Sequence, residues 1–284
     1  MRIIKVFVSG CRKAAAIWKG ILVIWFTQLM LVSVVVIPAR NVMENGFGKS
    51  MITEKLAGGL NFDAIGDLGA TLQNITYFVT SGVLILTFLN LFLNAFFTGG
   101  LFDSLKTTDE KFSKIRFFRS AAKNFWPFLW ITLIVNLIIL MLFLFTVILP
   151  VSLVSQSDTT SDKTVFLTGV ISVVFFLLVT IMLFLVTDYA RVWQVGNEKS
   201  ACFKALGFGF TYTFKRFLAS YPVILVITVV QIFYLWLVFI ISGYLKPESG
   251  SGVLLLFLLT QILFIIKITL KTWRYGCVTV MARE

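Results

Sequence analysis

The chain has 284 residues, of which 58% are hydrophobic and 13% charged, and its mean hydropathy is +0.95. A soluble protein of this length cannot bury so much apolar surface in one core, so the composition excludes that class and favours an integral membrane protein. The net charge of +12 would suggest nucleic acid in a soluble protein, but these basic residues flank apolar segments, so we expect anionic lipid headgroups and no nucleic acid as partners.

The first predicted element is an amphipathic helix over residues 1–19 that lies in the headgroup plane. Its apolar positions recur at helical spacing, and its basic positions repeat every seven residues on a neighbouring face. The apolar positions are Ile4, Val8, Cys11, Ala15 and Trp18, and the basic ones are Lys5, Arg12 and Lys19.

Six apolar segments follow, each long enough to cross a bilayer, because about 20 helical residues suffice. The predicted spans are residues 20–37, 77–98, 125–151, 164–187, 221–241 and 253–270. Pro38 closes the first span, and residues 39–76 form an outer loop with short helices expected at Ser50–Leu56 and Asp63–Ile75. The sequence therefore predicts an all-α, polytopic integral membrane protein with a single transmembrane domain.

A second amphipathic segment occupies residues 200–220, before the fifth span. One stripe of this segment is apolar and aromatic: Phe203, Leu206, Phe210, Phe214 and Phe217. Basic residues flank the stripe, as they do in the segment before the third span. We expect both segments to be interfacial helices on the inner face of the membrane.

The distribution of basic residues predicts the orientation. Of the 25 Lys and Arg residues, 20 lie in the N-terminus, after the second and fourth predicted spans, or at the C-terminal end. The other five are Arg40, Lys49, Lys55, Lys163 and Lys246. Because cytoplasmic loops carry the excess of Lys and Arg, we expect both termini in the cytoplasm and the chain in a bacterial cytoplasmic (inner) membrane.

The order of elements also suggests three parallel repeats, each an amphipathic helix, a span, an outer loop and a span. Residues 12–22 (RKAAAIWKGIL) align with residues 119–129 (RSAAKNFWPFL), and residues 213–225 match more loosely. Any pair of spans flanked by basic residues gives a similar pattern, so chance likeness is the alternative. Mitochondrial carriers share this plan, but the acid of their Pro-x-acid-x-x-base signature is missing after Pro38 and Pro150.

Two short motifs leave the second and fourth spans: Phe97-Thr98-Gly99-Gly100-Leu101 and Thr187-Asp188-Tyr189-Ala190-Arg191-Val192. With the basic amphipathic stretch before the fifth span, they resemble uncharacterised six-span bacterial membrane proteins. That group includes the membrane domain that accompanies some glycerophosphodiester phosphodiesterases. The resemblance implies a membrane fold and no defined chemistry.

Candidate sites fall into three sets. Polar residues within the spans could line a substrate path or bond between helices: Gln28, Asn90, Asn94, Asn136, Gln231 and Gln261. Basic residues form a candidate cytoplasmic face for lipid or a protein partner: Arg116, Arg119, Lys123, Lys204, Lys215 and Arg216. Charged residues stand at the mouths of the second and fourth spans, where gating, docking or interfacial ion pairing are the alternatives: Asp103, Asp188 and Arg191.

The sequence argues against catalysis. Histidine is absent, no nucleophile is paired with a base, and no carboxylate pair or metal-ligand cluster stands at a useful spacing. We therefore expect no enzyme and no cofactor. No ionisable residue is expected in mid-span, which weakens an ion-coupled transporter. The leading hypothesis is a scaffold or accessory subunit that engages anionic lipid or a membrane-protein partner, and the alternative is a permease or lipid-handling component.

Overall fold

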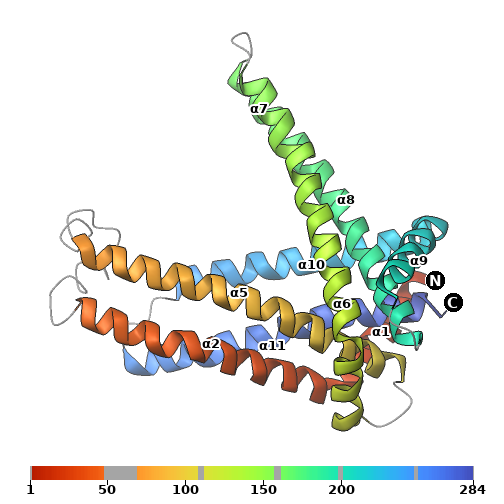
Figure 1. Ribbon diagram of the computed structural model, residues 1–284, viewed down its shortest axis with the longest axis horizontal. Helices are drawn as coiled ribbons and strands as arrows, with labels where there is room; N and C mark the ends of the chain where they lie inside the picture. Colours follow the sequence, from red (N-terminus) through yellow and green to blue (C-terminus); the bar gives the residue numbers. More distant parts are fainter. Residues whose placement is uncertain are drawn as a thin grey trace. The chain divides into compact units, whose positions relative to one another are not determined.

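The computed structural model describes residues 2–47, 69–107, 112–156, 161–197, 201–245 and 249–283. Every regular element in these ranges is a helix (Figure 1). Six helical runs are long and apolar enough to cross a membrane, which confirms the predicted fold class of an all-α, multi-pass membrane protein. They are α2 (Trp18–Phe47), α5 (Gly69–Lys106), α6 (Lys114–Phe143) continued by η1 (Leu144–Ile148) and α7 (Leu149–Ser155), α8 (Asp162–Gly196), α10 (Phe217–Tyr244) and α11 (Gly250–Met281). Two shorter helices, α1 (Arg2–Ala16) and α9 (Cys202–Lys215), precede α2 and α10.

The described chain forms two compact units. The smaller unit, Val23–Asn94, contains most of α2 and the first part of α5. Within it, the Gln28 side-chain amide donates a hydrogen bond of 3.3 Å to the side-chain oxygen Oδ1 of Asn90. A Cβ added at Gly82 would lie 2.7 Å from Val35 Cγ1, so α2 and α5 approach closely there.

Two prolines lie within continuous helical runs, and one of them, Pro38, was expected to close the first span. α2 continues past Pro38 to Phe47, so the prediction that this proline ends the helix is wrong. Pro150 follows the π-helical turn η1. The wider turn gives the proline ring room beside the preceding carbonyls, because a π-bulge interrupts the regular hydrogen-bond ladder that proline would otherwise break.

The predicted outer loop is only partly described. Its first residues, 39–47, belong to α2, and its last, 69–76, belong to α5. The helix expected at Ser50–Leu56 and residues 63–68 of the one expected at Asp63–Ile75 lie outside the described residues, and residues 69–75 are the start of α5.

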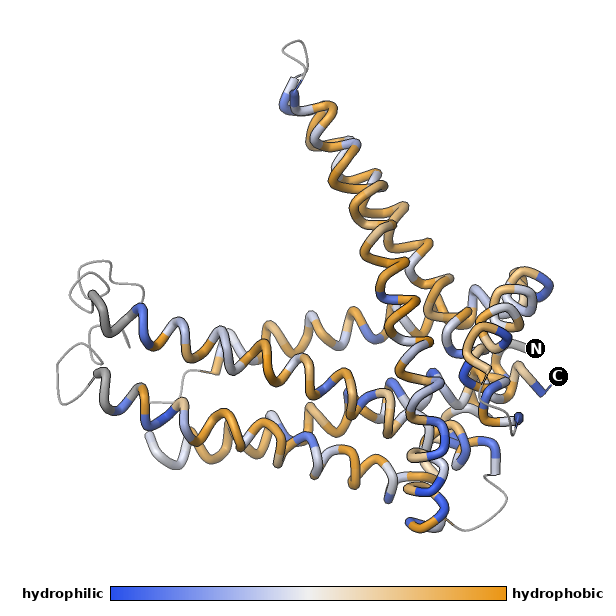
Figure 2. Tube along the Cα trace, viewed as in Figure 1, coloured by the Kyte–Doolittle hydropathy of each residue, from blue (hydrophilic) through white to orange (hydrophobic). Residues whose placement is uncertain are grey.

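The larger unit, Met1–Leu22 with Ala95–Glu284, is packed at one end of its long helices. We call this region the packed end: residues 117–135 of α6, 180–194 of α8, 220–227 of α10 and 268–281 of α11. Apart from Ser172, all buried residues of these four helices fall in it. Hydrophilic residues are concentrated there too, and the rest of each helix is mainly hydrophobic (Figure 2).

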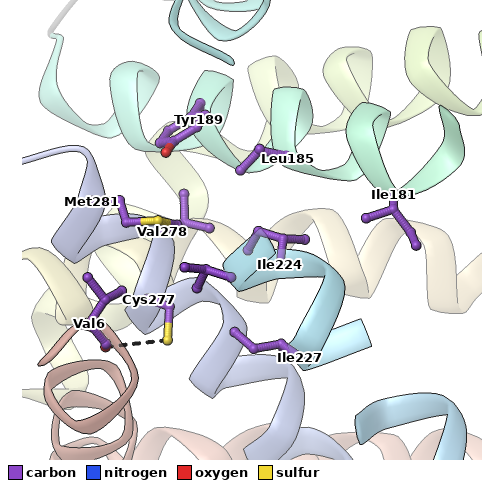
Figure 3. Packing of buried hydrophobic residues seen from close by; sticks show 10 residues of the cluster. Val6, Ile181, Leu185, Tyr189, Ile224, Ile227, Cys277, Val278 and Met281 are labelled. Atoms are coloured by element: carbon purple, nitrogen blue, oxygen red, sulfur yellow. Dashed lines mark hydrogen bonds between the residues drawn. The ribbon is translucent and has the colours of Figure 1, made fainter. Parts of the chain in front are cut away.

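An apolar cluster fills the packed end where α1, α8, α10 and α11 meet. It contains Val6, Ile181, Leu185, Tyr189, Val223, Ile224, Ile227, Cys277, Val278 and Met281. Figure 3 shows these side chains converging from the four helices, with the Cys277 thiol 3.6 Å from the carbonyl oxygen of Val6. The Tyr189 and Ser220 hydroxyls, 2.7 Å apart, join α8 to α10 beside the cluster.

The two short helices pack through small residues. A Cβ added at Gly276 of α11 would lie 2.6 Å from the carbonyl oxygen of Gly10 on α1, and one at Gly209 of α9 would lie 3.2 Å from Ala190 Cβ on α8. Such contacts bring backbones close together. On α1 the packed face is therefore the one that carries Gly10. The predicted apolar stripe of this helix, with Ile4 and Val8, is exposed instead.

Candidate functional site

A basic pocket opens at the start of α6. Arg116, Arg119 and Lys123 are three and four residues apart, so they share one helix face. With them, the pocket is lined by Asp103, Ser113, Ile115, Ser120, Asn124 and Val195, and its volume is about 470 Å³. We call this cavity the α6 pocket. It brings together three residues of the predicted basic face and one predicted helix-mouth residue.

The polar wall of the α6 pocket is held by buried hydrogen bonds. The Asn124 side-chain amide donates to the backbone oxygen of Ser120 at 3.0 Å and to its hydroxyl at 3.2 Å. The Ser120 hydroxyl donates to the carbonyl oxygen of Gly99 on α5 at 3.3 Å. This network fixes the start of α6 against the end of α5. Ser120 and Asn124 were not predicted as site residues. Each stands beside a basic residue in the sequence, and such a position gives no sign that the side chain is buried.

Asp103 is the acidic residue among the described lining residues of this pocket. Its carboxylate lies 3.1 Å from Nε of Arg116. The pair is partly exposed, so solvent screens it and its contribution to stability is small. The described lining residues carry three basic side chains and one carboxylate, a set that suits an anion that offers oxygen acceptors.

A second basic pocket lies where α9 meets α10. It has a volume of about 460 Å³, and its walls are Val6, Phe214, Lys215, Arg216, Phe217, Leu218, Ala219, Ser220, Val223 and Met281. We call this cavity the α10 pocket. It contains Lys215 and Arg216 of the predicted basic face. The remaining predicted basic residue, Lys204, is exposed and lines neither pocket.

An ion cluster is buried inside the packed end. Asp188 of α8 lies 3.0 Å from Nε of Arg274 on α11 and 3.5 Å from Nη1 of Arg191. Arg191 also donates a hydrogen bond of 2.9 Å from Nη2 to the Thr132 hydroxyl on α6. The cluster therefore ties three helices together. Asp188 is fully buried and Arg191 is 5% exposed, which corrects the expectation that both stand at an open helix mouth.

Aromatic rings surround the cations of this ion cluster. The Arg191 guanidinium lies 5.8 Å from the ring centroid of Phe128, and that of Arg274 lies 5.4 Å from Phe184 and 5.3 Å from Tyr275. Ring faces stabilise a cation that has left water. Burial of ions is costly without such partners, so these contacts make the arrangement tolerable in a poorly hydrated bundle.

Arg274 was not among the predicted site residues and was counted only with the basic residues of the C-terminal end. The available signal was the apolar run after it, Gly276–Met281, which indicates that the helix continues against a core. Because α8 likewise continues to Gly196, Asp188 lies within the bundle. The expectation about ionisable residues concerned mid-span positions, and it therefore did not anticipate this cluster in the last third of α8 and α11.

The polar residues predicted within the spans do not line either pocket. Gln28 bonds to Asn90 as described above, and the Gln231 side-chain amide donates a hydrogen bond of 3.3 Å to the carbonyl oxygen of Leu270. Asn94 and Gln261 are half-buried, and Asn136 is exposed. These two hydrogen bonds join helices, which is the alternative to a substrate path that the polar residues suggested.

No family model, curated protein or solved structure matches the chain. The predicted resemblance to six-span bacterial membrane proteins therefore stays a prediction, and the functional conclusion depends on the two pockets and the ion cluster.

Proposed function

We propose that the protein is a non-enzymatic scaffold or accessory subunit of a bacterial cytoplasmic membrane, and that its inner face binds anionic lipid headgroups. The observation that carries this proposal is the α6 pocket, where Arg116, Arg119 and Lys123 line one cavity on one face of α6. A volume of about 470 Å³ is in the range of small-ligand sites, and it suits a headgroup better than a folded partner.

The chemistry of the lining supports an anion. Each Lys or Arg near a membrane surface is worth about 1 kcal/mol toward anionic lipid, and the planar guanidinium of Arg can hold two phosphate oxygens at once. Ser120 and Asn124 add polar groups to the wall of the cavity. A headgroup bound there would contact α5, α6 and the end of α8 together.

The orientation is part of the proposal. The excess of basic residues at the N-terminus, the C-terminal end and the loops on the same side favours a cytoplasmic position for both termini. An even number of spans is consistent with that arrangement. Both pockets would then face the leaflet that carries the more negative surface potential.

A permease is the second candidate, and the ion cluster is the observation that favours it. Ionisable residues within membrane helices are costly and often mark transport paths. In this chain Asp188 is already paired with two guanidinium groups, which supports a structural role instead. A permease should lose transport when Asn90 and Asn94 are changed to Leu, whereas a scaffold should keep its lipid binding.

The test compares two triple variants that remove the same charge. R116Q/R119Q/K123Q empties the α6 pocket of cations, whereas K19Q/K114Q/K204Q removes exposed cations that line neither pocket. Phosphatidylglycerol bound to the purified protein in maltoside micelles is measured by native mass spectrometry over a lipid titration. We expect the first variant to weaken binding at its tightest site about 100-fold, at about 1 kcal/mol per cation, and the second to change it less than threefold. Equal losses in the two variants would contradict the proposal.

A further inference from the structure

We propose that the α10 pocket is a separate site for a whole anionic phospholipid, with the phosphate at Lys215 and Arg216 and one acyl chain along Phe214 and Leu218. The inference extends the proposed function, because it concerns different residues and a ligand that must carry an acyl chain. It does not depend on the α6 pocket being occupied.

The backbone at the pocket is a fixed turn between two helices. α9 ends at Lys215 and α10 begins at Phe217, with Arg216 between them. The backbone N–H of Arg216 donates to Tyr212, and its carbonyl oxygen accepts from Ala219 and Ser220 at 3.1 and 2.9 Å. The guanidinium of Arg216 lies 5.1 Å from the ring centroid of Tyr212. The cation is therefore placed at the rim by both its backbone and an aromatic neighbour.

The described charged residues that line this pocket are all basic. Among the described residues of its lining, Lys215 and Arg216 are charged and none is a carboxylate, whereas the described lining of the α6 pocket includes Asp103. The one buried polar wall residue, Ser220, is 1% exposed and held by the Tyr189 hydroxyl at 2.7 Å. An anion at the rim would supply the counter-charge that these described residues lack.

The other lining residues are apolar, and two of them, Phe214 and Leu218, are largely exposed. Leu218 is 87% exposed and Phe214 62% exposed. Both flank the cations at the start of α10, a helix apolar enough to cross the membrane. Val6 and Met281, which also line the pocket, belong to the apolar cluster of Figure 3. Inorganic phosphate would not bury the apolar surface of these walls. An acyl chain would bury it, and that burial contributes favourable free energy to binding.

The residues thus match an amphiphile in both of its parts. Lys215 and Arg216 lie directly before the apolar helix α10. The phosphate of a phospholipid likewise lies between water and the acyl chains. A free anion would use only Lys215 and Arg216. A phospholipid would use those two residues together with Phe214 and Leu218, and this difference makes the assignment testable.

The experiment titrates the purified full-length protein in maltoside micelles with dioleoylphosphatidylglycerol, or with glycerol phosphate as the headgroup alone, and measures bound ligand by native mass spectrometry. We expect K215Q/R216Q to weaken lipid binding at one site about 30-fold, at about 1 kcal/mol per cation. The control K114Q/K204Q, with the same loss of charge outside both pockets, should change it less than threefold. K215Q alone, which keeps the Arg216 turn, should give about a fivefold loss if the double variant unfolds.

A matched pair on α9 tests the acyl chain. Phe214 and Phe203 are both exposed, and only Phe214 lines the pocket. F214A should weaken lipid binding several-fold without changing the binding of glycerol phosphate, and F203A should change neither. Unchanged thermal unfolding in micelles confirms that each variant is folded.

Three results would overturn the inference. Glycerol phosphate binding as tightly as the lipid, with no effect of F214A, would make this a free-anion site. Polyglutamate that displaces the lipid and depends on Lys215 and Arg216 but not on Phe214 would assign the pocket to an acidic protein. Loss of all bound lipid in R116Q/R119Q/K123Q, with none in K215Q/R216Q, would leave the proposed function standing and remove this second site. The reverse pattern would keep this site and contradict the proposed role of the α6 pocket.

Discussion

The two halves of α8 differ in what surrounds them, although both are apolar. In the packed end, Leu185 and Val186 are fully buried, whereas Phe166 and Ile171 near the start of the helix are 73% and 60% exposed. In a bilayer an apolar side chain needs no protein partner, because lipid tails are as apolar as leucine. Hydropathy therefore indicates which segments cross the membrane, and it carries no information about which half of each helix packs.

What distinguishes the packed end is small and polar residues. Gly10 meets Gly276, Gly209 meets Ala190, and Asp188 binds two guanidinium groups. Close backbone contacts and polar pairs are the interactions that hold helices together where the hydrophobic effect does not. The predicted repeats would place such contacts in equivalent positions, and the repeats themselves stay a prediction.

The largest effect that should separate the two halves of α8 comes from Asp188→Asn. The change leaves the guanidinium groups of Arg191 and Arg274 buried without their counter-charge, and breaking a buried ion pair costs about 3–5 kcal/mol. We expect the free energy of unfolding, measured by titration with sodium dodecyl sulfate in mixed micelles, to fall by about that amount. Asp162→Asn, at the exposed start of the same helix, should change it by less than about 0.5 kcal/mol. Equal effects would mean that the ion cluster contributes nothing to the packed end.

A second comparison uses two isoleucines of α10. Ile224 is fully buried and Ile232 is 53% exposed. Ile224→Ala leaves a cavity in the apolar cluster and should cost about 2–3 kcal/mol in the same unfolding assay, because the lost packing cannot be replaced by lipid. Ile232→Ala should cost less than about 0.5 kcal/mol. A similar cost at both positions would show that the outer half of α10 is also packed against protein.

Two glycines of α9 should respond to alanine with opposite signs. A Cβ at Gly209 would overlap the carbonyl oxygen of Val186, whereas one at Gly207 has nothing within 4 Å. Gly209→Ala should therefore destabilise by about 1–2 kcal/mol through overpacking. Gly207→Ala should stabilise by up to about 1 kcal/mol, because alanine is the better helix former. If Gly209→Ala were also stabilising, α9 would not lie close against α8.

The smallest effect is expected for the polar pair in the other unit. Gln28→Leu and Asn90→Leu each remove the same interhelical hydrogen bond. Such bonds average about 0.6 kcal/mol in membrane proteins. A double-mutant cycle in the unfolding assay should give a coupling free energy of about that size. Coupling above about 2 kcal/mol, or loss of lipid binding in either variant, would require a larger role for this pair.

The sequence predicted the six long helices because each apolar run far exceeds the length of an average soluble helix. It also predicted the cations of the α6 pocket, since the spacing of Arg116, Arg119 and Lys123 on one helix is a local property. It could not place Arg274 against Asp188, because these residues are distant in the chain and no local pattern pairs them. Nor could it distinguish a proline that ends a helix from one that a π-turn accommodates, as at Pro150.

The account as a whole requires that the packed end and its pockets face the cytoplasm. Labelling with a membrane-impermeant maleimide tests this directly at three exposed positions: the native Cys11 on α1, Ser113→Cys at the rim of the α6 pocket, and Ser249→Cys before α11. In sealed right-side-out vesicles, we predict that Ser249→Cys reacts, and that Cys11 and Ser113→Cys react only after permeabilisation. Reaction of Ser113→Cys from the same side as Ser249→Cys would contradict the account.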